Sequence, residues 1–280
     1  MAIKAKIYLF EGNWTQVKNI TSTIMTEGGF KLFGSYAGLF EIANEYNSEV
    51  ILDAQYRPTS REHQMMYVFL PPTLGGYSQL SPLQELVDSY IMLDGKTIKE
   101  TGTSFDESHP YANRDPRLKA TVMYTGNSYT LADGTEVVIN CEKGEGKDGY
   151  GVGSDCSATG YYIKKYWDNT YRATLYSGLN PILIRYADIL LMNAEALAEL
   201  GELDKTAWDA TIKPIRDRAG FTLASALEFP EGASKDKLIE IVRNERRSEL
   251  ALEGHRHKDI IRWRIADNVL NGWCHGLKTN

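Results

Sequence analysis

The chain has 280 residues, of which 42% are hydrophobic and 24% are charged, so it is long enough and apolar enough to bury a sizeable core. Its formal net charge is −6, and it shows no basic stripe with interleaved aromatic residues. Nucleic acid is therefore excluded as the main partner.

The sequence contains no segment that is typical of a membrane span or a signal peptide. The longest apolar stretch is interrupted by Arg185 and Asp188, and the first residues lack a basic start followed by an apolar run. Apolar residues are in helical phase from Ala2 onward with no capping residue before them, so we expect the chain to begin inside a truncated helical segment.

Residues 2–26 are predicted to form a helical hairpin. Residues 2–10 and 14–25 each show helical periodicity, and Glu11-Gly12-Asn13 is a typical turn between them.

Residues 30–180 are predicted to form a loop-rich insertion with a few short strands and helices. Short extended segments are expected at 30–33 and 50–52, and a short helix at 82–90. Residues 122–124 and 136–140 are expected to pair around the turn at Ala132-Asp133-Gly134.

The segment 180–202 is the most informative part of the sequence. It reads as an amphipathic helix in which Ala187, Ala194 and Ala198 recur at helical spacing, so that a second helix can approach closely. Gly201 is expected to end this helix in a left-handed conformation, and residues 208–218 supply an antiparallel partner. This is the pattern of a tetratricopeptide-like hairpin, a unit used for scaffolding and recognition.

Residues 181–271 complete a helical scaffold, with further helices at 235–253 and 259–271 joined at Gly254. The predicted fold class is therefore mainly α, with tetratricopeptide-like hairpins and one large insertion, in a single domain of residues 1–280.

The helix at 235–253 places Glu245, Glu249 and Glu253 on one face, an arrangement also found in carboxylate–metal sites and acid–base pairs. Several arginines surround them, which favours ionised carboxylates in structural ion pairs. His255 and His257 lie beside Glu253 and Asp259 but lack a metalloprotease spacing, so we expect no metal and no cofactor.

The stretch Gly144 to Gly149 has glycine spacing like that of a dinucleotide-binding loop, but no strand precedes it and no helix follows. We interpret it as a flexible loop. Cys141 and Cys156 flank this loop, and the sequence leaves open whether they form a disulfide. Neither these cysteines nor the nearby serines have a histidine close in sequence, so no catalytic residue is expected.

Several motifs occur in the chain in a fixed order. They are Glu11-Gly-Asn-Trp14, Asn113-Arg-Asp-Pro-Arg-Leu118, Gly160-Tyr-Tyr-Ile-Lys-Lys-Tyr166, Arg185-Tyr-Ala-Asp-Ile-Leu-Leu-Met-Asn-Ala-Glu195, the run from Ile241 to Gly254 and Asp259-Ile-Ile-Arg-Trp263. Together they resemble the SusD/RagB family of surface glycan-binding lipoproteins from Bacteroidetes, over nearly the whole chain.

The resemblance implies a non-enzymatic protein at the cell surface, in the outer membrane, that binds an oligosaccharide or sometimes a peptide. It also implies that the ligand is delivered to a SusC-like TonB-dependent transporter as partner. By this resemblance we expect the sequence to be an internal piece, without the lipid anchor that such proteins use for membrane contact, the first helices and the customary C-terminal segment.

Aromatic residues concentrate in the insertion, where loops on a rigid scaffold can expose flat rings to sugars. They are Tyr56, Tyr67, Tyr77, Tyr111, Tyr124, Tyr129, Tyr150, Tyr161, Tyr162, Tyr166, Trp167, Tyr171 and Tyr176. Tyr162, Tyr166 and Tyr186 lie within the family motifs and are expected to pack internally. The predicted ligand residues, each beside polar side chains, are Tyr67, Tyr77, Tyr129, Tyr150 and Trp167.

Two alternatives remain at this stage. One is a tetratricopeptide-type adaptor that binds a protein or peptide on the hairpin at 187–218. The other, less favoured, is a glycosidase that uses Glu245 and Glu249.

Overall fold

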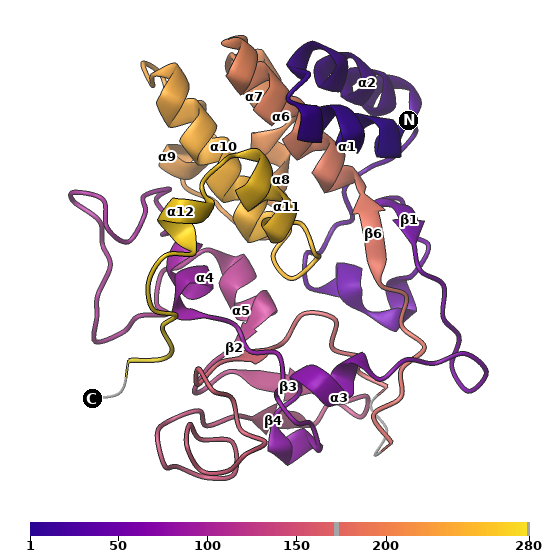
Figure 1. Ribbon diagram of the computed structural model, residues 1–280, viewed down its shortest axis with the longest axis vertical. Helices are drawn as coiled ribbons and strands as arrows, with labels where there is room; N and C mark the ends of the chain where they lie inside the picture. The colour runs from indigo at the N-terminus through magenta and orange to yellow at the C-terminus, as the bar shows by residue number, and fades with distance from the viewer. Residues whose placement is uncertain (171–173, 279–280) are drawn as a thin grey trace.

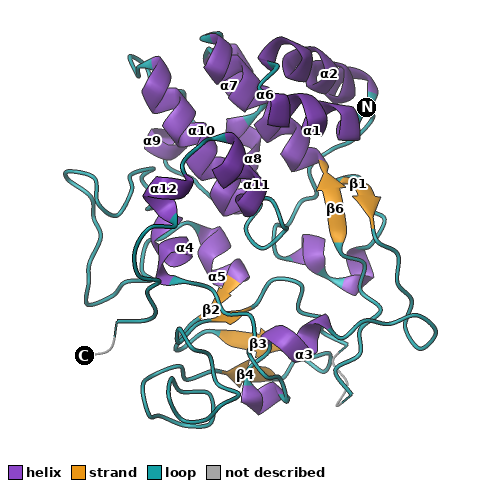
Figure 2. Cartoon of the chain, in the orientation of Figure 1, coloured by secondary structure: helices purple, strands orange, loops and turns teal. Residues whose placement is uncertain are grey.

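The computed structural model describes residues 1–170 and 174–278, and it separates helices from loops along the long axis of the molecule (Figure 1). Most of the longer helices gather at one end, and the other end consists mainly of loops that connect short strands and short helices (Figure 2). None of the described helices is both long enough and apolar enough to span a bilayer.

The helical end contains α1 (Ala2–Glu11), α2 (Trp14–Glu27), α6 (Tyr186–Leu200), α7 (Lys205–Ala210), α8 (Ile212–Ala219), α9 (Ala224–Leu227), α10 (Lys235–Glu249), α11 (Arg256–Arg262) and α12 (Ala266–Val269). The first hairpin agrees with the prediction: Gly12 adopts φ 71° at the end of α1, and the Asn13 side chain accepts a hydrogen bond from the Gln16 N–H at the start of α2.

Helix α6 is the central element of the scaffold. Gly201 ends it with φ 72°, and its N–H bonds back to the Ala198 carbonyl, which confirms the predicted left-handed cap. The predicted alanine row is buried against α7, α8 and α10 in one core cluster. The opposite face, including Ile189, packs against α1 and α2. Helix α6 is therefore covered on two sides.

Several helix boundaries differ from the prediction: the helix expected at 235–253 ends at Glu249, and α11 and α12 replace the helix expected at 259–271. Residues 182–185 form a strand, β6 (Ile182–Arg185), because Ile182 and Ile184 alternate toward the interior and pair with β1 (Val50–Asp53). The predicted helix 208–218 is interrupted at Thr211 and gives α7 and α8. Pro214 explains the break, since its ring collides with the carbonyl four residues earlier in a continuous helix.

The loop-rich end contains α3 (Met65–Phe69), α4 (Gln84–Ser89), α5 (Pro116–Thr121) and the 3₁₀ turns Gly38–Phe40, Ile42–Asn44 and Pro72–Leu74. Its strands are β2 (Val122–Met123), β3 (Ser128–Thr130), β4 (Glu136–Val138) and β5 (Tyr162–Ile163). Within the described residues the strands form three two-stranded antiparallel sheets, β1–β6, β2–β5 and β3–β4.

The predicted hairpin is correct in its turn and wrong in one of its strands. Gly134 has φ 83° at the turn, as expected for Asp-Gly, but β4 pairs with β3 and places Tyr129 opposite Val137. Strand β2 pairs instead with β5, and in this pairing Val122 lies opposite Ile163. The residues at 30–33 form no strand.

Candidate functional site

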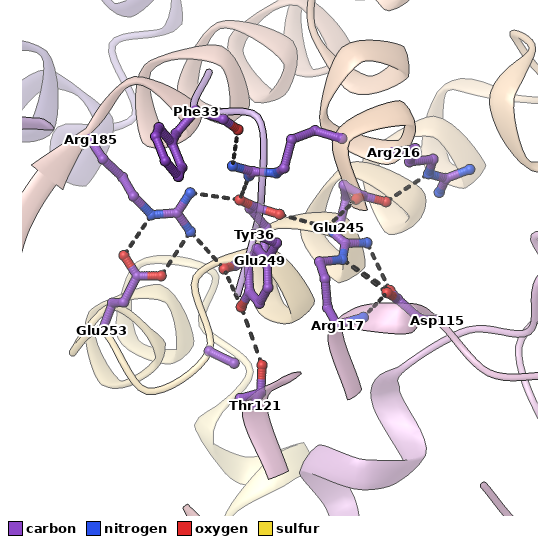
Figure 3. A network of polar contacts seen from close by, with 12 residues as sticks. Phe33, Tyr36, Asp115, Arg117, Thr121, Arg185, Arg216, Glu245, Glu249 and Glu253 are labelled. Carbon is purple, nitrogen blue, oxygen red and sulfur yellow. Dashed lines mark hydrogen bonds and ion pairs between the residues drawn. The ribbon is translucent and has the colours of Figure 1, made fainter. Parts of the chain in front are cut away.

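A network of buried ion pairs joins the helical end to the loop-rich end (Figure 3). We call it the central ion network. Its members come from α5, α8, α10, β6 and the loops between them: Glu49, Asp115, Arg117, Lys165, Arg185, Arg216, Arg218, Glu245, Glu249 and Glu253.

Glu249 is the hub of the central ion network. Its carboxylate accepts from Arg185 Nη1 at 2.6 Å and from Arg117 Nη1 at 2.8 Å, and it also pairs with Arg218. Glu253 accepts from Arg185 at 2.8 Å and from Lys165 Nζ at 2.6 Å. These contacts tie the end of α10 and the turn after it to four other segments, which carry Arg117, Lys165, Arg185 and Arg218.

The electrostatics identify these carboxylates as structural. Burial by itself would raise the pKa of Glu253, but Arg185 and Lys165 outweigh it and lower the pKa to about 2. The arginines likewise hold the pKa of Glu249 well below its usual range, and the pKa of Glu245 is lowered. A glycosidase acid requires a raised pKa. The expectation of structural ion pairs is confirmed. Glu245 and Glu249, the two residues of the glycosidase alternative, lack the raised pKa that a general acid needs.

These lowered pKa values predict a loss of stability in acid. A carboxylate with a folded pKa below its unfolded pKa, which is about 4.3 for glutamate, stabilises the fold fully above that unfolded value. Its contribution is lost as the pH falls toward the folded pKa, here about 2 for Glu253. Asp115 acts in the opposite sense, because burial raises its pKa. We expect urea midpoints to fall steeply between pH 4.5 and 2, and a constant midpoint across that range would contradict this account.

His255 and His257 lie at the start of α11, where His255 is the residue just before the helix. Burial lowers the pKa of His255 to about 4, and its Nδ1 lies 3.4 Å from Arg246 Nη2. Among the residues that the structure describes, no group of three or more potential ligands could hold a metal ion. The three cysteines are unpaired, with Cys141 buried and the Cys156 thiol donating to the Lys147 carbonyl.

The structure divides the five predicted ligand residues into two groups. Tyr67, Tyr77 and Tyr150 are exposed, each by 37–39%. Tyr129 and Trp167 lie together in the core of the insertion, with ring centroids 5.1 Å apart.

Tyr129 and Trp167 are buried and offer little side-chain surface to a ligand. The Tyr129 side chain is fully buried and donates its hydroxyl to the Ile163 carbonyl at 2.7 Å. Trp167 is 8% exposed and donates Nε1–H to the Thr130 carbonyl at 2.9 Å. Both rings fill the space between β3 and β5. As expected, Tyr162 and Tyr166 are buried too, whereas Tyr186 is only partly buried; Tyr171 lies outside the described residues.

Tyr67 and Tyr77 form a paired aromatic surface, which we call the tyrosine platform. Their rings lie 4.5 Å apart at an interplanar angle of 32°, and the Tyr67 hydroxyl donates to the Tyr77 oxygen at 3.1 Å. The pKa of Tyr67 is raised, first by this hydrogen bond, then by partial burial, and further by Tyr77, Asp155 and Tyr176. Tyr176 is 42% exposed and belongs to the same neighbourhood, although its sequence context did not single it out.

The loop that follows α3 positions Tyr77. It folds back on the helix, so that the Tyr77 N–H bonds to the Tyr67 carbonyl at 2.9 Å and the Leu80 N–H to the Val68 carbonyl at 3.1 Å. Gly76 makes this path possible, because a Cβ there would lie 2.2 Å from the Leu70 carbonyl oxygen. The two rings therefore come together through main-chain geometry.

The loop that carries Tyr150 is fastened to the same region. The Asp148 carboxylate accepts from the Thr73 N–H at 2.7 Å and from the Thr73 hydroxyl at 2.5 Å. The Tyr162 hydroxyl donates to the Asp148 carbonyl. Such anchored loops present exposed side chains on a firm base.

Comparison with known proteins agrees with this architecture. The model of the SusD family matches residues 38–278. The chain belongs to the SusD family.

A SusD-like carbohydrate-binding protein of Bacteroides fragilis has a solved structure that is similar to this one. The TM-score is 0.84 at 30% sequence identity, over 97% of this chain and 53% of that chain. A SusD superfamily protein from Bacteroides vulgatus gives a TM-score of 0.70 at 25% identity, over 95% of this chain and 51% of that one.

Among curated proteins, SusD-like protein P25 of Formosa agariphila is 28% identical over 96% of this chain. SusD-like protein P2 of the same organism is 26% identical over 91% of this chain. The chain spans about half the length of these two relatives, 50% and 51% respectively.

Proposed function

We propose that this SusD family protein binds an oligosaccharide on the loop-rich end without reacting with it. The observation that carries the proposal is the tyrosine platform: two adjacent rings, each more than one third exposed. The C–H faces of sugar rings pack on flat aromatic surfaces, and the hydroxyl groups of Tyr67 and Tyr77 offer hydrogen-bond partners beside them.

Two further features support binding in place of catalysis. The carboxylates of Glu245, Glu249 and Glu253 are buried in ion pairs and have lowered pKa values. In addition, the similar protein from Bacteroides fragilis is described as carbohydrate-binding. Wet, polar contacts over a small surface predict modest affinity, which suits a protein that must release its ligand.

The proposal extends to the location and partner that the family resemblance implies. The protein would act at the outer surface of the cell, held there by a lipid anchor, and would pass its ligand to a SusC-like TonB-dependent transporter. Co-purification of the two proteins from membranes tests this part independently of ligand binding.

Removing one ring of the platform tests the ligand site. Tyr77→Ala is expected to lower affinity about tenfold, which corresponds to about 1.4 kcal/mol, for the oligosaccharide that binds best on a glycan array. Titration calorimetry measures the effect. Tyr46→Ala is the matched control, because Tyr46 is 67% exposed at a distant loop. Equal affinities for all three proteins would overturn the site.

The adaptor alternative has less support, because the apolar residues of its hairpin are used in the core. Ala187, Trp208, Ile212 and Ile215 are each less than 2% exposed. A glycan array without any hit, combined with a peptide bound at α6–α8, would favour that alternative.

A further inference from the structure

Two neighbouring hollows beside α10 and α11 share a pair of arginines, Arg247 of α10 and Arg256 of α11. The larger hollow, about 530 Å³, is bounded by Arg243, Trp263 and Ile265 among others. The smaller, about 260 Å³, has a largely aliphatic wall formed by Leu83, Leu86, Leu250 and Leu252. Arg247 and Arg256 line both hollows.

The other arginines of this region have carboxylate partners. Arg243 pairs with Glu199 at 2.9 Å, Arg246 with Asp188 at 2.6 Å, and Arg262 with Glu195 at 2.6 Å. By contrast, no carboxylate of residues 1–170 or 174–278 forms an ion pair with Arg247 or Arg256. The two arginines therefore lack a direct ion-pair partner among these residues, and the carboxylates of Glu85, Asp88 and Asp259 act on them only without such a contact.

The groups nearest to Arg247 and Arg256 are neutral or are already paired with other residues. Arg247 donates to the Glu85 carbonyl, and the Arg256 guanidinium lies over the Trp263 ring at 5.8 Å. The negative charge of Asp259 favours the ionised form of Arg256, but the Asp259 carboxylate forms its ion pairs with Arg246 and Arg262. The Glu85 carboxylate contacts His275. Burial and the charge of Arg256 lower the pKa of Arg247 to about 10, so it stays ionised at neutral pH.

The acidic side chains of the larger hollow do not neutralise the pair either. Glu199 is engaged by Arg243, and Glu240 lies 3.3 Å from Lys237 on the outer side of α10. Asp236 occupies the first turn of α10, about three helical turns before Arg247.

We propose that Arg247 and Arg256 bind the carboxylate of a small ligand whose aliphatic group fills the smaller hollow. A guanidinium presents a planar set of donors that matches a carboxylate, and two of them supply charge-assisted hydrogen bonds. The smaller hollow is below the roughly 300 Å³ typical of whole-ligand sites, so it admits one small side group. Sugar hydroxyls would find few partners against its leucines, which separates this site from the tyrosine platform.

Leucine-like acids and their amides test this proposal. The probes are 4-methylpentanoate, the peptide Gly-Gly-Leu and Gly-Gly-Leu amide, titrated into the unaltered protein and followed by calorimetry or NMR shifts. At least one acid is expected to bind, and the amide to bind at least tenfold more weakly. Binding of 4-methylpentanoate indicates a free organic acid, and binding of the peptide alone indicates a peptide C-terminus.

Substitutions then locate the site. Arg256→Gln is expected to weaken acid binding at least tenfold, whereas Lys258→Gln, an equal loss of charge on the exposed face of the same helix, leaves it unchanged. Oligosaccharide binding stays as in the unaltered protein. Equal binding of acid and amide, or no binding of either acid, overturns the proposal without any variant, and so does an Arg256→Gln protein that folds and binds normally.

Discussion

Glu249→Ala is expected to lower the free energy of unfolding by about 3–5 kcal/mol, because it leaves buried arginines without their counter-charge. Glu249 is fully buried and contacts Arg117, Arg185 and Arg218. Desolvated guanidinium groups cannot recover the lost interaction from water. Urea unfolding followed by circular dichroism measures the difference, and urea is preferred over guanidinium because it adds no salt.

Glu240→Ala provides the control for this experiment. Glu240 lies on the same helix but is exposed and pairs only with Lys237, so we expect a change within about 0.5 kcal/mol. If both variants lost equally little stability, the central ion network would not join the two ends of the molecule as described.

Trp167→Ala is expected to destabilise the protein by about 3–5 kcal/mol, the usual range for removing a buried tryptophan. The ring packs against Tyr129 in the core of the insertion and donates to the Thr130 carbonyl. The variant therefore tests whether the insertion has a core of its own. Any loss of oligosaccharide binding should accompany unfolding and should not occur in the folded fraction.

Trp273→Ala is the matched substitution, because Trp273 is 89% exposed and its removal should leave stability nearly unchanged. A Trp167→Ala protein that unfolds at the normal urea midpoint but fails to bind sugar would restore Trp167 to the ligand site.

Helical periodicity and glycine caps were sufficient to predict most of the scaffold. The hairpin at 2–26, the alanine row of α6 and the cap at Gly201 are all local features, so one sequence can reveal them. Strand pairing is not local. β1 and β6 are more than 120 residues apart in the chain, and only their buried alternation at Ile182 and Ile184 hinted at a strand before α6.

The candidate ligand residues show the same limit. Polar neighbours suggested exposure for Tyr129, yet in a strand the neighbours of a buried residue point outward, as Ser128 and Thr130 do when both contact Glu136. In a strand, the outward positions of Ser128 and Thr130 imply that the Tyr129 side chain between them points into the core. The pairing of Tyr67 with Tyr77 depends on the backbone path through Gly76, and the proximity of Arg247 to Arg256 depends on the packing of α11 beside α10, so neither could be read from the sequence.

A crystal structure of the protein with the oligosaccharide that it binds best gives the most direct test of the central proposal. We predict a sugar ring stacked on Tyr67 or Tyr77, at the loop-rich end, with the carboxylates of Glu245 and Glu249 still buried in their ion pairs. A ligand bound along α6–α8, with the tyrosine platform empty, would contradict the account.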